Sequence, residues 1–175
     1  MTRMANPLKW LAVLAATVVV GVGLWLTPPK VPDLTLSVID GRRIRLTALQ
    51  GQPVLVSFWA SDCRACLEEM PALQALYTEF APQGLHLLAV AMPYDPPSRV
   101  LSLARERQIP YPVILDPDGA VTRAFGSVSL IPRHFLIDAK GRIRQDILGK
   151  IDPATLRPLL LTLLELDSII ENNAR

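Results

Sequence analysis

The sequence predicts an α/β fold in which a mixed β-sheet is flanked by helices, with an N-terminal β-hairpin and a single N-terminal transmembrane helix. Three features support this fold class. Apolar, β-prone runs alternate with helical patterns, the sheet closes on two strands joined by a short turn, and the N-terminus carries a long uncharged run. Half of the 175 residues are hydrophobic, so one domain with a substantial core is expected.

The uncharged run is WLAVLAATVVVGVGLWL, beginning at Trp10. At about 1.5 Å per residue it spans roughly 26 Å, close to the roughly 30 Å of a hydrocarbon core. It lacks the small-x-small site of a cleaved signal peptide, so we expect residues 10–27 to be a transmembrane signal-anchor. Arg3 and Lys9 precede it, which places residues 1–9 in the cytoplasm and the rest of the chain on the far side. In a bacterium, that side of the inner (cytoplasmic) membrane is the periplasm, where disulfides persist.

Beyond this segment we expect a stiff proline-rich tether over residues 28–33 and one folded domain over residues 34–175. In TLSVIDGRRIRL, apolar and polar residues alternate on both sides of the DG pair, which predicts a β-hairpin over residues 35–46. PVLVSFWA favours a fully buried strand over residues 53–60. The other expected elements are a strand at 85–92, a helix at 98–107, a strand at 111–115, a short helix at 120–125, strands at 131–138 and 143–150, and a final helix with Asp152 as N-cap and Pro153 at its first position.

Two features of the sequence bear on its partners. The final helix has more leucines than one buried stripe needs, for which packing on the sheet is the simpler account and dimerisation the alternative. The formal net charge is only +2 and the arginines are scattered along the chain, so no nucleic-acid partner is expected.

The segment WASDCRACLEEMP, residues 59–71, holds both cysteines of the chain, Cys63 and Cys66. One pair builds no disulfide framework and supplies only two ligands, so no metal site is expected. The pair lies between a buried strand and a helix expected over residues 63–80, where free N–H groups and the helix dipole stabilise a thiolate at the first cysteine. We therefore expect Cys63 to attack a disulfide and Cys66 to resolve the mixed disulfide that results.

The pattern of this helix predicts which side chains face the core. Arg64 and Glu68 fall on the far side, where they are ordinary solvated residues, while Glu69 falls inside the apolar stripe, one turn beyond Cys66. A carboxylate on that stripe suits a proton acceptor for the resolving thiol, unless its side chain bends out to solvent. The stripe comprises Cys66, Met70, Leu73, Leu76, Tyr77 and Phe80.

Together these residues resemble the TlpA/ResA-type membrane-anchored thiol-disulfide oxidoreductases of the thioredoxin superfamily. The resemblance is carried by the strand ending FWAS, the cysteine pair with Arg64-Ala65 inside it, Pro71, and Ile131-Pro132 followed by FLID and a Lys-Gly turn. It spans roughly residues 33–165 and implies a thioredoxin-like sheet with an insertion over about residues 97–115.

For the site, the resemblance implies a cis peptide bond between Ile131 and Pro132 that lies against the sulfurs and helps to hold the substrate chain. It also implies that Pro71 kinks the helix, and that Glu69 is the glutamate that family members place near the cysteines.

Three residues around the pair are expected to tune the site: Trp59, Asp62 and Arg64. Asp62 departs from the family, which usually has an aromatic residue there, most often tryptophan. Its presence is expected to expose Cys63 and to remove a surface on which partner proteins pack. At about 6 Å in water its charge disfavours a thiolate by roughly 0.7 kcal/mol, and Arg64 opposes it by a similar amount, so we expect activity to survive.

The expected function is that of a protein disulfide reductase, with no cofactor beyond the redox-active disulfide Cys63–Cys66. The resemblance implies disulfide or dithiol clients such as apocytochrome c, in cytochrome c biogenesis, or copper-site cysteines of oxidase subunits, and a membrane electron donor of the DsbD/CcdA type. The residues alone do not fix the direction of electron flow. The family and the charge of Asp62 favour a reductant.

Two other functions use parts of the same sequence. A copper metallochaperone combines such a pair with a histidine, for which His134 is the candidate, although a place on a strand face accounts for it more simply. A thiol peroxidase needs Pro at position 56 and Thr at position 60, where the chain has Val56 and Ala60. His86 lies in a buried-strand pattern and is expected to be structural.

Overall fold

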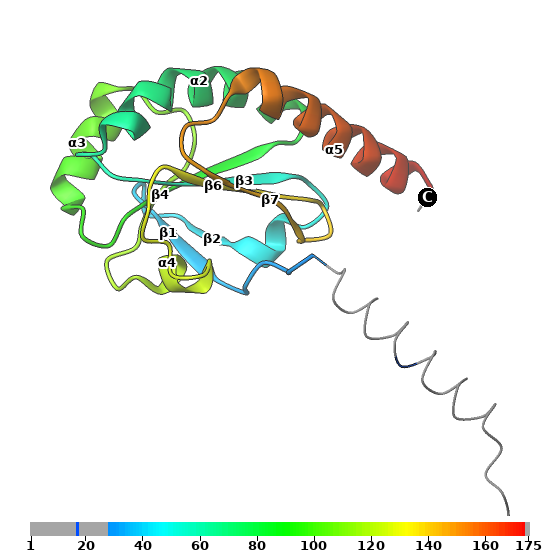
Figure 1. Ribbon diagram of the computed structural model, residues 1–175, viewed down its shortest axis with the longest axis horizontal. Helices are drawn as coiled ribbons and strands as arrows, with labels where there is room; N and C mark the ends of the chain where they lie inside the picture. Colours follow the sequence, from blue (N-terminus) through cyan, green and yellow to red (C-terminus); the bar gives the residue numbers. More distant parts are fainter. Residues whose placement is uncertain (1–16, 18–27, 174–175) are drawn as a thin grey trace, which may run out of the picture.

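The computed structural model describes residue 17 and residues 28–173, with side chains described as far as residue 165 (Figure 1). The elements, in chain order, are β1 Thr35–Val38, β2 Arg43–Arg45, η1 Leu46–Leu49, β3 Val54–Trp59, α2 Arg64–Phe80, η2 Ala81–Gln83, β4 His86–Ala91, α3 Pro97–Glu106, β5 Val113–Leu115, α4 Ala120–Ala124, β6 Arg133–Ile137, β7 Ile143–Leu148 and α5 Pro153–Asn173.

The strands form one seven-stranded mixed sheet in the order β2-β1-β5-β4-β3-β6-β7. The three inner strands β3, β4 and β5 run parallel, whereas the β1–β2 hairpin and the β6–β7 hairpin add to them antiparallel. All six residues of β3 are buried, as the apolar run predicts for a central strand covered on both faces. The cysteine loop follows Trp59, the last residue of β3, and therefore lies at one edge of the sheet.

Helices cover both faces of the sheet, with α2 and α5 along one face and α4 against the other (Figure 1). Successive residues of β3 point to opposite faces, so Leu55 joins the core beneath α2, α3 and α5 while Val56 joins the core beside α4 and the β1–β2 hairpin. The mixed sheet, the flanking helices and the N-terminal hairpin are therefore confirmed.

The helix α2 differs in detail from the sequence-based expectation. It begins at Arg64, because Cys63 has an extended backbone and serves as the N-cap. Pro71 lies inside α2, where its missing N–H leaves the carbonyl of Leu67 without its helical hydrogen bond. In α5, Leu160 is fully buried in the core, so the described part of this helix packs on the domain as expected.

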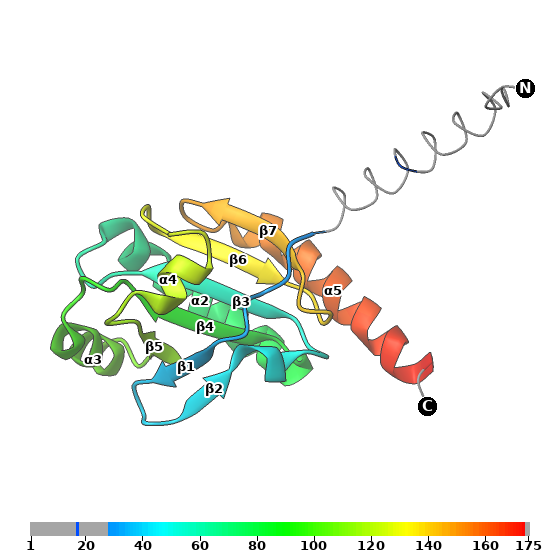
Figure 2. The same cartoon turned by 90° about the horizontal axis from the view of Figure 1, so that it is seen from below.

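The segment expected to be a tether, residues 28–33, lies partly against the sheet (Figure 2). The Val31 N–H donates to the Gly141 carbonyl at 2.8 Å, and the Ile143 N–H donates to the Pro29 carbonyl at 2.8 Å. Because Val31 is also buried in the core, residues 29–31 belong to the folded domain, which begins earlier than the expected residue 34.

The predicted signal-anchor, residues 10–27, lies outside the described residues except for position 17. Within the described residues, no helix combines the length and the apolar character needed to span a bilayer. The anchor therefore stays a prediction from the sequence.

Candidate active site

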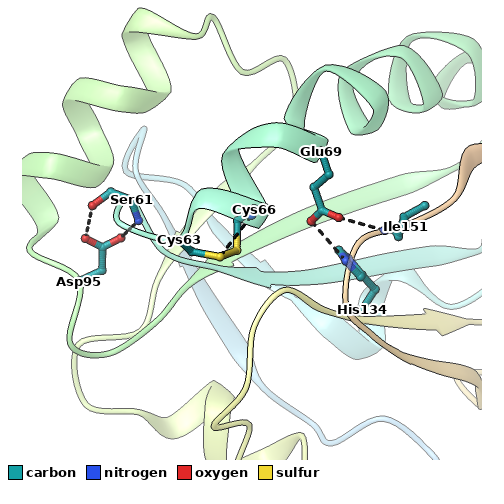
Figure 3. The surroundings of a disulfide bond; sticks show 7 residues. All are labelled: Ser61, Cys63, Cys66, Glu69, Asp95, His134 and Ile151. Atoms are coloured by element: carbon teal, nitrogen blue, oxygen red, sulfur yellow. Dashed lines mark hydrogen bonds and ion pairs between the residues drawn. A yellow bond between two sulfur atoms is a disulfide. The ribbon is translucent and has the colours of Figure 1, made fainter.

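Cys63 and Cys66 form a disulfide at the N-terminus of α2, with their Cα atoms 5.3 Å apart (Figure 3). Cys63 is half-buried, whereas Cys66 is 1% exposed. The Cys66 N–H donates to Cys63 Sγ at 3.2 Å, so a free N–H of the first helical turn already points at the first sulfur. When the pair is reduced, this donor and the positive end of the helix dipole stabilise a thiolate at Cys63.

The loop ahead of the pair is fixed from the neighbouring strand by Asp95, a residue that the sequence analysis did not single out. Asp95 follows β4 and is 6% exposed, and its carboxylate accepts from the Ser61 N–H at 2.5 Å and the Ser61 hydroxyl at 2.6 Å (Figure 3). Parallel strands β3 and β4 end at the same edge of the sheet, which is the signal that could have paired these positions.

The Ile131-Pro132 peptide bond is cis, as the resemblance implied. Arg133, the next residue, pairs with Phe58 in the antiparallel β3–β6 register, so Pro132 lies beside the end of β3 from which the cysteine loop departs. The Pro132 carbonyl accepts from the Gly149 N–H at 2.8 Å, which ties this loop to the end of β7.

The charged residues around Cys63 face solvent. Arg64 is 92% exposed and donates from Nε to Glu68 Oε1 at 2.8 Å, and Glu68 Oε2 accepts from Lys150 Nζ at 3.1 Å. These contacts, led by the bond from Arg64, hold the pKa of Glu68 below its usual value. Asp62 is exposed, and its charge adds to the effect of burial in raising the pKa of Tyr94, an exposed ring on the β4–α3 connection.

Trp59 is buried behind the cysteines rather than beside them on the surface. Its side chain lines a cavity of about 10 Å³ together with Cys66, Glu69 and Tyr111, among others. In the described part of the chain, Trp59 Nε1 has no hydrogen-bond partner. Burial, followed by the charge of Glu69, raises the pKa of Tyr111, so its hydroxyl stays neutral at physiological pH.

Glu69 turns inward, so the alternative that its side chain bends out to solvent is wrong. Its side chain is 2% exposed, and Oε2 accepts from the Ile151 N–H at 3.0 Å. Its other oxygen, Oε1, lies 3.3 Å from Nε2 of His134 (Figure 3). Glu69 and Cys66 thus border the same small cavity from consecutive turns of α2.

His134 does lie on a strand, as expected, but its partner places it at the site. It projects from β6 toward α2 and its side chain has no exposed surface. Sequence reasoning missed the pairing because the two residues lie 65 positions apart, although an acid on an apolar stripe was a signal that a partner was needed.

His86 behaves as a structural residue, since it is half-buried and its Nε2 lies 2.6 Å from Gln52 Oε1. Burial lowers its pKa. Among the residues that the structure describes, no three His, Cys, Asp or Glu side chains gather in a way that could hold a metal ion. A larger cavity of about 580 Å³, between the β1–β2 hairpin and the end of α3, is lined by neither cysteine.

Comparisons with known proteins agree with this geometry. The AhpC/TSA family model matches residues 29–146. The thiol-disulfide oxidoreductase ResA of Geobacillus thermodenitrificans is 36% identical over 118 residues, covering 67% of each chain, and ResA of Bacillus subtilis is 31% identical over 118 residues, covering 67% of this chain and 65% of its own.

Solved structures give the same result. A thioredoxin-family thiol:disulfide interchange protein from Chlorobium tepidum superposes with a TM-score of 0.71 at 26% identity, over 78% of this chain and 97% of its own. StoA from Bacillus subtilis superposes with a TM-score of 0.64 at 25% identity, over 74% and 98% of the two chains.

Proposed function

The chain belongs to the AhpC/TSA family and is a ResA-type thiol-disulfide oxidoreductase of the thioredoxin superfamily, and from this membership we propose that it reduces disulfides in client proteins at the membrane surface. The observation that carries the proposal is the asymmetry of the pair. Cys63 is half-buried and accepts a hydrogen bond from an N–H at the start of α2, while Cys66 is fully buried and lines the same small cavity as Glu69. This is the arrangement of one attacking and one resolving thiol.

In the reducing direction, the Cys63 thiolate attacks one sulfur of the client disulfide, and the other client sulfur leaves as a thiolate. Cys66 then gives its proton to the Glu69 carboxylate, and the Cys66 sulfur attacks Cys63 Sγ. The second client sulfur leaves, so the client has gained two electrons and the protein holds the Cys63–Cys66 disulfide seen here.

We propose that Ile131-Pro132 lines the groove that holds the client backbone near Cys63, since Pro132 lies beside the end of β3. Clients such as apocytochrome c fit this chemistry. The disulfide itself serves as the redox group, without another cofactor, and it needs a membrane electron donor of the DsbD/CcdA type to return it to the dithiol.

Localisation is proposed from the sequence alone. Residues 10–27 would anchor the chain in the inner membrane, with the catalytic domain in the periplasm. Protease added to spheroplasts tests this, because it should remove the domain only if the domain faces outward. Protection of the domain in intact spheroplasts would refute the orientation.

The reduction potential of Cys63–Cys66 in the full chain tests the direction of electron flow. We expect a value below about −220 mV in a glutathione or dithiothreitol titration, as for a reductase fed by a membrane donor. A value near the roughly −120 mV of a strong oxidant would show that the protein forms disulfides instead. The absence of a reversible dithiol couple would refute the exchange reaction itself.

A further inference from the structure

We propose that His134 is a positioning residue for the resolving step: Nε2 of its neutral ring takes over the proton that the Glu69 carboxylate receives from Cys66, and the imidazolium formed in this way then holds the carboxylate in place. The inference rests on the proposed function, because it concerns how Cys66 loses its proton.

Each oxygen of the carboxylate faces a different polar group. Oε2 of Glu69 accepts from the Ile151 N–H at 3.0 Å, and Oε1 lies 3.3 Å from His134 Nε2 (Figure 3). Because the two groups come from the β7–α5 loop and from β6, each oxygen contacts a different element. The side chain is thereby kept at the wall of the cavity that it shares with Cys66.

Burial gives the Glu69 carboxylate a reason to face a second polar group. The side chains of His134 and Glu69 are 0% and 2% exposed, and an isolated carboxylate at such depth is costly unless a donor or a cation offsets its charge. The 3.3 Å contact has ion-pair length without hydrogen-bond geometry, and among the described residues neither ring nitrogen of His134 has a hydrogen-bond partner. The imidazole is therefore available to donate to the carboxylate or to take a proton from it.

With the imidazole of His134 as the final acceptor, the resolving step has a complete path for its proton. This path has the neutral ring of His134 carry its own hydrogen on Nδ1, which leaves Nε2 as the acceptor. The proton leaves Cys66 for Glu69, passes from Oε1 to Nε2 of His134, and leaves a carboxylate beside an imidazolium. The buried pair then carries no net charge, while the electron pair stays on the Cys66 sulfur and forms the bond to Cys63.

The other polar and charged groups on the packed elements offer no competing proton acceptor beside Glu69 and His134. His134 is flanked in the sheet by Ser57 of β3 and Ile147 of β7, and neither titrates in the physiological range. The Tyr111 hydroxyl, which shares the cavity, is kept neutral by its raised pKa. On α2 and the β7–α5 loop, the charged groups are engaged elsewhere: Glu68 with Lys150, and Asp152 with the first turn of α5.

The test separates attack from resolution. The reduced full chain is mixed in a stopped flow with a chromogenic aromatic disulfide that releases one coloured thiolate when Cys63 attacks and a second when Cys66 resolves. In His134→Leu we expect the second release to slow about tenfold near neutral pH and to recover at alkaline pH, where Cys66 ionises without help. The first release should keep the wild-type rate.

Further variants distinguish a role in proton transfer from a role in folding. Glu69→Gln should show the same slow second phase, and combining it with His134→Leu should add no further loss, since both act on one step. His134→Gln keeps a donor at this place but takes up no proton, so its second phase should be intermediate. His86→Gln removes the other histidine of the chain and should match the wild type in both phases.

Two outcomes would overturn the inference: an unchanged second phase in His134→Leu at every pH, or losses that multiply in the double variant. If His134→Leu does not fold, a wild-type second phase in His134→Gln overturns it equally. A wild-type protein that fails to release the first thiolate would instead refute the proposed function.

Discussion

Asp95 shows how a single buried carboxylate positions the attacking cysteine. Asp95 is almost fully buried, and its carboxylate accepts hydrogen bonds from both the N–H and the hydroxyl of Ser61, two residues before Cys63. Replacing it by alanine leaves these two donors without their acceptor. We expect Asp95→Ala to lower the free energy of unfolding of the oxidised full chain by about 1–3 kcal/mol, measured by urea denaturation.

A matched control is Asp118→Ala, which removes an exposed aspartate whose side chain accepts from the backbone N–H of Ala120 at 3.3 Å. Its effect should stay within about 0.5 kcal/mol. Equal effects of the two substitutions would mean that the bonds to Ser61 do not stabilise the loop.

The contrast between Glu69 and His134 shows what the sequence could reveal at the scale of residues. A helical period placed Glu69 on the buried stripe, because that pattern is local and depends only on spacing. Its partner could not be found in the same way, since the contact depends on which residue of a strand 65 positions away faces the helix. Asp95 was not predicted for the same reason, because its partner, Ser61, lies 34 residues away in the sequence.

At the scale of elements, the question for α5 is whether its many leucines all pack in the core. Leu160 is fully buried and Leu161, its neighbour, is 42% exposed, so the two substitutions differ in burial while removing the same atoms. We expect Leu160→Ala to cost about 2–5 kcal/mol of unfolding free energy and Leu161→Ala about 0.5 kcal/mol or less, by urea denaturation of the full chain. A larger cost at Leu161 would indicate that this face of the helix is covered in solution, as the dimerisation alternative requires.

The β1–β2 hairpin is tied to the preceding segment by a charge pair with a predictable dependence on pH. Arg45 donates to Asp33 through two nitrogens, at 3.0 and 2.6 Å, and Thr47 donates to it at 2.9 Å. The bond from Arg45, followed by that from Thr47, lowers the pKa of Asp33 from 3.8 to about 2. A depressed pKa in the folded state means that stability is present above pH 3.8 and is lost as the pH falls through about 2.

We therefore expect the urea midpoint of Asp33→Asn to lie below that of the wild type at neutral pH, and the difference to close between about pH 4 and about pH 2. Asp118→Asn, which removes the same charge from a residue bonded to the backbone of Ala120, corrects for the change in net charge. A difference that persists unchanged at the acid end would mean that the ionisation of Asp33 is not its source.

At the scale of the whole molecule, the order and type of the elements followed from the sequence, whereas the start of the domain did not. Apolar runs and turn residues are local signals, so each strand and helix expected beyond residue 34 is present, with ends that differ by a few residues. PPKVP carries no strand pattern, and it docks because Val31 fits the core beside the β6–β7 turn. Such complementarity exists only after the sheet has formed.

The docked segment predicts a boundary that can be tested with two fragments. The fragment 28–175 retains the backbone bonds of Pro29 and Val31 to β7 and its turn, whereas the fragment 32–175 loses them but keeps Asp33 and its pair with Arg45. The loss comprises two backbone hydrogen bonds and the burial of one valine, so we expect the shorter fragment to be less stable by about 2–4 kcal/mol in urea denaturation.

The contrasting expectation is that residues 28–33 serve only as a spacer, in which case the two fragments would unfold at the same urea concentration. The site offers an internal check, because Gly141 and Ile143, which hold the segment, lie at the opposite end of the β6–β7 hairpin from Pro132 and Gly149. Loss of the segment should therefore lower stability while leaving the reduction potential of Cys63–Cys66 unchanged. A shift of that potential would mean that the two ends of the hairpin are coupled.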